Sequence, residues 1–462
     1  MATNWKTKRL QDCATWFSGG TPKKSNSAFW DGEIPWISAK SLTDFFVFDS
    51  DDKVTEAAIG YGTRMVPKNS ILFVVRGMSL KTEFRVGITT RAVSFNQDVK
   101  ALVPIEGIEP DFLAYAIKAK SPEILSLVEE AGHGTGVLPT TLIQSLEIAV
   151  PSLTTQKTIG QFFRALDRKI ELNRQMNTTL EAMAQALFKS WFVDFDPVID
   201  NALLTGNPIP EPLQARAEMR KALGEQRKLL PAEIQRQFPS RFVFTEAMGW
   251  VPEGWRNMRA DEVASISIGK TPPRKESQWF SDVTADSLVW VSIRDMGNSG
   301  VFIGDSSEYL TTESVQKFNV KIVPKDSVIL SFKLTLGRVA IADTELTTNE
   351  AIAHFVSPRF GLNKEYLYLY LRSFDYGNLG STSSIATAIN SKIIKSMPVL
   401  VPNAGALKAF EEVARFWFSS ICENISQTET LTKLRETLLP KLLSGQLRIP
   451  DAEAIVEQVA AG

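Results

Sequence analysis

The sequence contains two similar copies of one long segment, and this internal repeat limits the folds that the chain can adopt. The stretch WKTKRLQDCATWFSGGTP, which begins at Trp5, aligns without a gap on WRNMRADEVASISIGKTP, which begins at Trp255. The similarity returns where LEIAVP, from Leu146, matches MPVLVP, from Met397, and it continues into a helical stretch. Each copy is much longer than the unit of a solenoid repeat. The sequence therefore predicts two similar globular domains, each followed by a long helix.

The composition is that of an ordinary protein that folds in water. Of the 462 residues, 44% are hydrophobic and 22% are charged. The two cysteines, Cys13 and Cys422, lie at non-equivalent positions of the two copies, which argues against a disulfide framework or a zinc cluster. No apolar run is long enough to cross a bilayer, and the N-terminal segment lacks the apolar stretch of a signal peptide. We therefore expect a cytoplasmic protein.

Basic segments recur at the same place in both copies, although the formal net charge is only -1. Between Arg64 and Arg91 the basic residues are accompanied by a single acidic one, Glu83. The equivalent stretch from Lys317 to Arg338 likewise contains one acidic residue. One such run could be a solvated strand face, but two equivalent runs favour binding of a polyanion.

Each copy alternates strand-like and helical segments, which predicts a mixed α/β or α+β domain of ordinary size. In the first copy we predict strands at IPWISAK and SILFVVRG, a helix over residues 110–131, the glycine loop AGHGTG and a last strand, LEIAVP. In the second copy the same order is expected for LVWVSIRD, SVILSFKL, the helix KEYLYLYLRSF, the polar loop GSTSSIA and MPVLVP.

The helical stretch after each copy has the spacing of a coiled coil. In the first, apolar residues alternate spacings of four and three from Ile159 to Trp191, and the second runs from about Leu407 to Leu443. Asn173 and Asn424 fall at equivalent positions, where a buried amide would select the register; a solvated edge is the alternative. The residues expected in the contact between the helices or with a partner are Phe163, Ile170, Asn173, Leu180, Leu187, Asn424, Leu431 and Leu438.

Candidate catalytic signals fail on inspection. Gly269-Lys270-Thr271 imitates the end of a phosphate-binding loop, but Ala264 stands where that motif requires glycine. The loop GHGTG follows a predicted helix, whereas a dinucleotide fingerprint follows a strand. Only His133 and His354 are available for histidine chemistry, and they are not equivalent. We therefore do not expect an enzyme.

Four phrases identify a known family by resemblance. LEAMAQALFKSWFVDFDPV (residues 180–198), MGWVPEGW (248–255), the SGGTP turn and LRETLLPKLLSGQLRI (434–449) together resemble the specificity (S) subunit of type I restriction-modification systems. The resemblance spans essentially the whole chain. One departure is that family members commonly carry Glu-Gln-x-x-Ile after the final proline of the domain, whereas residues 155–159 read TQKTI.

The resemblance implies an α+β architecture with a pseudo-twofold repeat, in which two target-recognition domains are joined by two long antiparallel helices. The boundaries that we expect are residues 1–152 for the first recognition domain, 153–195 for the first spacer helix, 196–250 for a connector, 251–403 for the second recognition domain, 404–447 for the second spacer helix and 448–462 for a C-terminal tail.

The resemblance also implies a function without catalysis. Such a subunit reads a bipartite sequence in double-stranded DNA, one half-site per domain, and docks two methyltransferase (M) subunits on its helices. S-adenosylmethionine, ATP and Mg are expected on the M subunits and on motor/endonuclease (R) subunits, and no cofactor or metal on this chain. A complex that only methylates is one alternative. A coiled-coil scaffold with two protein- or carbohydrate-binding modules is another.

Base reading requires polar side chains on loops or strands that enter a groove, and other basic groups hold the phosphates. The candidates in the first copy are Lys23, Lys24, Lys40, Arg76, Lys81, Arg85 and Thr135. The candidates in the second copy are Lys270, Arg274, Lys275, Arg294, Lys333, Arg338 and Ser383. On the helices, we expect a surplus of apolar residues to dock the M subunits, namely Phe162, Met176, Met183, Phe188, Phe192, Phe410, Phe416 and Phe418.

Overall fold

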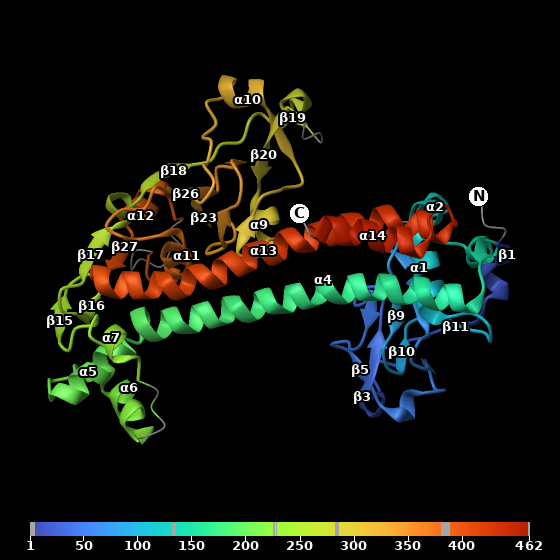
Figure 1. Cartoon of the computed structure of the whole chain (residues 1–462), viewed down its shortest axis with the longest axis horizontal. Coiled ribbons are helices and arrows are strands. Elements are labelled where there is room, and N and C mark those ends of the chain that lie inside the picture. The colour runs from blue at the N-terminus through green and yellow to red at the C-terminus, as the bar shows by residue number, and fades with distance from the viewer. Residues whose placement is uncertain are drawn as a thin grey trace. The chain divides into compact units, whose positions relative to one another are not determined.

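The computed structural model describes residues 5–131, 135–224, 227, 229–281, 286–379 and 389–460 (Figure 1). The chain divides into two compact units. The first unit combines Met1–Asn173 with Gln427–Gly462, and the second unit is Arg174–Ser426. Each unit therefore holds one copy of the repeat together with one part of each long helix.

The first unit contains two larger sheets and two smaller ones. One sheet has the order β2 (Ala14–Ser18), β11 (Val99–Pro104), β7 (Ile71–Val74), β9 (Val86–Thr89) and β4 (Phe46–Val47). A second has the order β5 (Lys53–Val54), β3 (Trp30–Ile37), β10 (Val93–Phe95) and β6 (Arg64–Val66). The smaller sheets are the pair β1 (Lys6–Arg9) and β14 (Glu147–Val150), and the trio β12 (Glu129–Ala131), β13 (Thr135–Val137) and β8 (Arg76–Gly77).

The second unit repeats the strand order of the five-stranded sheet, whereas its four-stranded sheet has a different order. Its five-stranded sheet runs β18 (Ser265–Ile268), β26 (Ile352–Val356), β23 (Val328–Ser331), β24 (Val339–Ala342) and β21 (Phe302–Ile303). Its four-stranded sheet runs β19 (Phe280–Ser281), β22 (Tyr309–Thr311), β20 (Ser287–Val291) and β25 (Thr347–Thr348). The two-stranded sheets are β17 (Arg256–Arg259) with β27 (Pro398–Val401), and β15 (Phe242–Thr245) with β16 (Gly249–Pro252).

The five-stranded sheets of the two units match in strand direction as well as in order. In both, the first three pairings are antiparallel, and the last strand, β4 or β21, pairs in parallel with its neighbour. The central strands β7 and β23 are buried along their whole length, as their continuous apolar sequences predict. The predicted internal repeat and the mixed helix and sheet architecture are thus confirmed.

Two predicted elements end early. The helix predicted over residues 110–131 is α1 (Pro110–Ala119) followed by a separate α2 (Ser121–Ser126). Pro122 lies in the first turn of α2 and has no amide hydrogen with which to continue the hydrogen bonding of α1. In the second copy the strand LVWVSIRD stops at Val291. Ser292 and Asp295 then form reciprocal caps that begin α9 (Ile293–Asn298).

The long helices are α4 (Leu153–Phe188), which ends in a π-helical turn over Lys189–Val193, and α13 (Ala404–Leu443). Within the first unit, Asn173 Nδ2 donates to Gln427 Oε1 at 2.8 Å and Arg435 bonds Asp167 at 2.6 Å. Residue numbers thus rise along one helix as they fall along the other, which makes the pair antiparallel, as expected.

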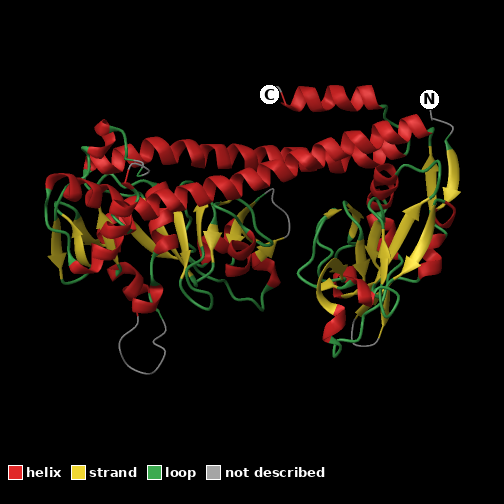
Figure 2. Cartoon of the chain, turned by 90° about the horizontal axis from the view of Figure 1, so that it is seen from below, coloured by secondary structure: helices red, strands yellow, loops and turns green. Residues whose placement is uncertain are grey.

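The same helices pair within the second unit, where Asn424 Nδ2 donates to Asn177 Oδ1 at 2.9 Å. Asn173 is buried and Asn424 is half-buried, so neither lies on a solvated edge. In each unit the strands lie to one side of the helix pair (Figure 2). The segment expected to be a C-terminal tail is largely helical, as α14 (Ile449–Ala460).

Four of the eight apolar residues expected to form a docking surface are buried instead, so that expectation is wrong for them. The four are Phe188, Phe192, Phe410 and Phe418, and they belong to the core of the second unit. Their rings pack against Tyr366, Tyr368 and Trp255, which explains their burial. Met176, Met183 and Phe416 are exposed, as the docking surface requires.

The connector between the copies folds into short helices held by ion pairs. They are α5 (Asp196–Thr205), α6 (Glu211–Ala222) and α7 (Ala232–Gln235). Asp196 and Asp200, both buried, accept hydrogen bonds from Arg216 and Arg220. None of the helices in the described ranges combines the length and apolarity needed to span a membrane.

Candidate nucleic-acid interface

The turn that follows the first strand of each large sheet is fixed in the same way in both copies. A Cβ atom on Gly19 would overlap the carbonyl oxygens of Phe95 and Asn96, and one on Gly269 would overlap Thr348 and the carbonyl of Asn349. Only glycine allows this close approach of two backbones. The repeated Gly-x-Thr-Pro pattern is therefore required by the geometry of the turn.

Side-chain hydrogen bonds also hold this turn in both copies. The indole of Trp36 donates to the carbonyl of Gly20 at 3.1 Å, and the indole of Trp290 donates to the carbonyl of Lys270 at 3.3 Å. The following threonine also binds across the turn, because Thr21 Oγ1 donates to Gln97 Oε1 at 2.6 Å. Thr271 makes the equivalent bond to Glu350. The turn is thus a rigid support for the basic residues that come after it.

In the first copy, three of the predicted DNA contacts come together beside the loop that joins β7 to β9. Arg76, in β8, pairs with Val137 of β13, the strand that also carries Thr135. Lys81 lies in the same loop, 3.5 Å from Glu130. Arg76 and Lys81 are exposed, and Thr135 is half-buried. A strand that is distant in sequence therefore adds a hydroxyl group to a cationic loop.

The remaining candidates of the first copy are more dispersed. Lys23 and Lys24 are exposed after the turn, and the Lys23 carbonyl accepts from Trp30 Nε1 at 3.3 Å. Arg85 donates to the carbonyl of Ala39 at 3.2 Å and bonds Glu83. Lys40 lines a hollow of about 760 Å³ that also contains Asp44, Asp49, Asp51 and Asp52. These carboxylates oppose a phosphate at Lys40.

In the second copy the candidates form two groups. Lys270, Arg274 and Lys275 follow the turn. Lys270 Nζ donates to the carbonyl of Phe318 at 2.7 Å, and Arg274 makes two bonds to Glu308, at 2.6 and 2.9 Å. Arg274 also lies over the ring of Trp290, 4.4 Å from its centroid. Much of its charge is therefore already balanced within the copy.

The second group surrounds the hairpin between β23 and β24. Lys333 is exposed in this hairpin, and Arg294 is exposed on α9. Arg338 Nη1 donates to the carbonyl of Ile293 at 2.5 Å, which ties the base of the hairpin to α9. Ser383 lies outside the described residues. DNA contact by any of these candidates stays a prediction.

A neutral histidine supports the second copy from within its sheet. His354, in β26, is buried, and its ring nitrogens lie 2.8 Å from Ser267 Oγ and 2.7 Å from Thr348 Oγ1. Burial lowers the pKa of His354 to about 4, because the imidazolium would lose its hydration. The side chain is thus uncharged at neutral pH and serves to hold the sheet beneath the turn.

The loops that carry the basic candidates also expose aliphatic side chains. Leu334 is 100% exposed at the tip of the hairpin between β23 and β24, and Met78 is 63% exposed in the loop between β7 and β9. Neither residue belongs to a pattern of polar and basic side chains. The repeat itself was the available signal, since both residues follow equivalent strands.

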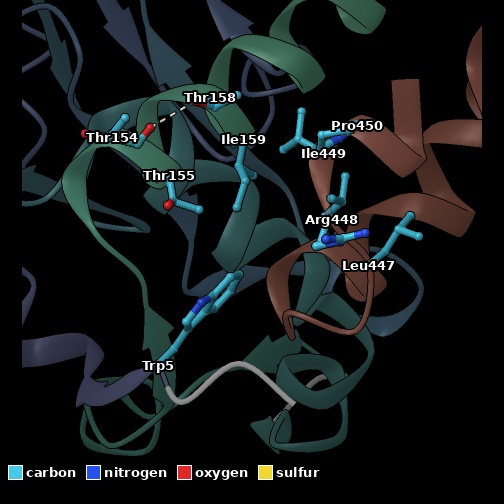
Figure 3. A pocket seen from close by; sticks show the side chains of 10 residues that line it. Trp5, Thr154, Thr155, Thr158, Ile159, Leu447, Arg448, Ile449 and Pro450 are labelled. Atoms are coloured by element: carbon cyan, nitrogen blue, oxygen red, sulfur yellow. Dashed lines mark hydrogen bonds between the residues drawn. The ribbon is translucent and has the colours of Figure 1, made fainter. Parts of the chain in front are cut away.

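One cavity of the first unit is lined mainly by apolar and hydroxyl side chains. This hollow of about 310 Å³ is lined by Trp5, Ile159, Leu447 and neighbouring threonine and aliphatic side chains, with Arg448 as its charged residue (Figure 3). In the part of the chain that the structure describes, no three His, Cys, Asp or Glu side chains gather as a metal site would require.

Comparison with known proteins agrees with this architecture. The family model for the type I restriction modification DNA specificity domain matches residues 2–182 and 252–408. The chain therefore belongs to the type I restriction-modification specificity family, whose role is DNA sequence specificity.

Individual relatives match over most of the chain. The specificity subunit of the type I restriction enzyme MjaIX from Methanocaldococcus jannaschii is 23% identical over 97% of this chain and 94% of its own. The HindI specificity subunit from Haemophilus influenzae is 28% identical over 73% of this chain and 77% of its own. The crystal structure of the S subunit from M. genitalium, 12% identical, superposes with a TM-score of 0.51 over 95% of this chain and 96% of that one.

Proposed function

We propose that this chain reads a bipartite sequence in double-stranded DNA, one half-site per copy of the repeat. The observation that carries the proposal is the recurrence of one strand order with a basic loop at the same place, between β7 and β9 and between β23 and β24. Two related domains on one chain can address two half-sites, as the subunits of a symmetric dimer do. Because their loops differ, the half-sites differ.

The chain catalyses no reaction itself and binds the subunits that do. Two M subunits dock on the helix pair and bring S-adenosylmethionine, and R subunits bring ATP and Mg. In support, α4 exposes Leu172, Met176 and Met183, and α13 exposes Phe416. Large exposed apolar side chains at helical spacing are typical of a protein contact.

The proposal is tested with the full chain assembled with the M subunits of its own system. Methylated sites in cells that carry this complex are sequenced, and we expect one motif with two defined halves separated by unread bases. A single uninterrupted motif would contradict the bipartite reading. Omitting this chain is the control and should abolish the motif.

Salt dependence distinguishes DNA reading from a scaffold for proteins or carbohydrates. Neutralising phosphates releases counterions, so the logarithm of the binding constant should fall linearly with the logarithm of salt concentration. A duplex without the motif should bind more weakly but with a comparable slope. Binding that is insensitive to salt would contradict the proposal.

A further inference from the structure

The hairpin between β23 and β24 presents an apolar side chain where a polar one would be expected. Its tip, Leu334, is 100% exposed, whereas Phe332, two residues earlier, is 3% exposed. An isolated exposed leucine is common on protein surfaces. Here, however, the backbone at Leu334 has a φ of +62°, a left-handed conformation that costs energy for a bulky residue. Such strain persists only where the surroundings enforce it, and it occurs often at binding sites.

The surroundings do enforce it. Ser331 Oγ donates to the carbonyl of Thr335 at 2.6 Å and accepts from the amide of Arg338 at 3.0 Å. The amide of Gly337, whose φ is +84°, donates to the carbonyl of Ser331 at 3.0 Å. Arg338 then fixes the base of the hairpin to α9. Leu334 is therefore held outward by a closed hydrogen-bonded loop.

The charge around the tip indicates what it meets. The hairpin sequence SFKLTLGR contains Lys333 and Arg338 and no acidic residue, and Arg294 is exposed on the neighbouring α9. An apolar tip within a cationic surface fits a duplex, whose phosphates attract the cations and whose stacked bases accept an apolar side chain. A protein partner would not require this surplus of positive charge.

The first copy also exposes an apolar side chain in the loop after the equivalent strand. Met78 begins the 3-10 turn Met78–Lys81 in the loop that joins β7 to β9, and it is 63% exposed. Arg76 and Lys81 flank it, and the pairing of Gly77 with Gly136 of β13 fixes the backbone before it. The two loops differ in length, and Lys81 lies 3.5 Å from Glu130, so what recurs is an exposed apolar side chain near basic residues after equivalent strands.

We propose that Leu334 in the second copy and Met78 in the first insert between adjacent base pairs and unstack them, one step in each half-site. This proposal rests on the proposed function, because it assumes that each copy faces a half-site. Leucine and methionine are both among the side chains that open base steps in other protein–DNA complexes. Specificity then arises in part from how easily the step deforms, in addition to contacts with base edges.

The test uses the complete complex with M subunits and a duplex that carries the mapped motif. The fluorescent base 2-aminopurine, whose emission rises when it is unstacked, replaces one base at a time at positions that are not methylated. We expect a rise at one step in each half-site. In the Leu334→Asn variant, the rise in emission should disappear at the base step that faces the second copy. Asparagine tolerates the left-handed backbone but is polar. Affinity for the motif should fall by about tenfold or more.

Matched variants distinguish the insertion of Leu334 or Met78 between base pairs, called the wedge below, from a general loss of the fold. Leu336→Asn changes the same residue type in the same hairpin, where the side chain is 39% exposed, and should keep the signal. Leu334→Met should also keep it. Met78→Asn should remove only the rise in the other half-site. The signal from a base flipped for methylation should survive in all of these variants, since flipping belongs to the M subunits.

Each outcome is decisive. Intact, salt-dependent binding of the unaltered complex with no rise at any unmethylated step would overturn the wedge and leave the proposed function standing. Failure of the unaltered complex to bind the duplex would overturn both. Loss of M subunits from the Leu334→Asn complex, with its fluorescence unchanged, would show that the tip docks a protein and would also overturn the wedge.

Discussion

The two copies attach to helix α4 by the same kind of bond but in different electrostatic surroundings. In the first unit, the hydroxyl of Tyr115 in α1 donates to Asp167 at 2.7 Å. In the second unit, Tyr368 in α11 (Lys364–Ser373) donates to Glu181 at 2.7 Å. The Asp167 side chain is 7% exposed and bonds Arg435 of α13, whereas that of Glu181 is 22% exposed and lies 3.6 Å from Arg372. Both units thus use a tyrosine hydroxyl bonded to an acidic side chain of α4, but the cation beside that acidic side chain and its exposure differ.

The sheets show the same relation. The turn glycines and the tryptophans that bind them are equivalent in the two copies. The strand pairing that places Ser267 beside His354 in the second copy places Phe17 beside Ala101 in the first. A hydrogen-bonded polar pair thus occupies the site of an apolar one. The comparison teaches that the backbone framework is common to the copies, while the side chains on it have diverged.

The largest difference in stability between the two units is expected when Arg435 or Arg372, the cations beside the attachments, is replaced. Arg435→Met should lower the free energy of unfolding of the first unit by about 4 kcal/mol, because it leaves the buried Asp167 carboxylate without its cation. Arg372→Met should cost the second unit less than about 1 kcal/mol, because that pair is more exposed. Hydrogen exchange of peptides from α1 and α11 in the full chain measures both. Equal losses in the two variants would show that the surroundings do not differ as described.

The shared framework is tested by the turn glycines. Gly19→Ala and Gly269→Ala should each destabilise their own unit by about 3 kcal/mol, because the new methyl group meets backbone oxygen atoms that cannot move aside. Gly300→Ala is the control, since a Cβ there meets nothing within 4 Å. Hydrogen exchange of β2 and β18 reports the result. If only one of the two turns were sensitive, the framework would not be common to both copies.

A smaller effect is expected in how the stability of the two units depends on pH. Because the pKa of folded His354 is about 4 and that of an unfolded histidine about 6.5, the unfolded chain binds the proton first. The contribution of neutral His354 to the free energy of unfolding is complete above pH 6.5 and is lost as the pH falls toward 4. At pH 5 the second unit should therefore have lost about 2 kcal/mol that a His354→Gln variant retains.

The measurement is hydrogen exchange of β26 in both proteins at pH 7 and pH 5, corrected for intrinsic rates. The corresponding strand of the first copy, β11, carries Ala101 at this position and serves as the internal control. A difference between the proteins that did not change with pH would mean that His354 is not kept neutral by burial.

The sequence was sufficient to predict the strands and helices of the two copies, but not to predict which side chains are exposed for binding. The repeat and the buried central strands follow from periodicity and alignment, which backbone geometry determines, and the antiparallel direction of the helices was implied by the family resemblance. Periodicity cannot tell which neighbour covers an apolar residue, so Phe188 and Phe410 were assigned to a partner although they complete the core of the second unit. Leu334 and Met78 were missed because their role depends on exposure and loop conformation, which composition does not reveal.

The central claim is that each copy reads one half-site on its own, and exchanging one copy tests it most directly. Residues 5–150 are replaced by the equivalent segment of a relative that has a different target, and the methylated sites are sequenced from cells that carry the complex with its M subunits. We predict that one half of the motif changes and the other half stays the same. A change in both halves, or in neither, would contradict the account.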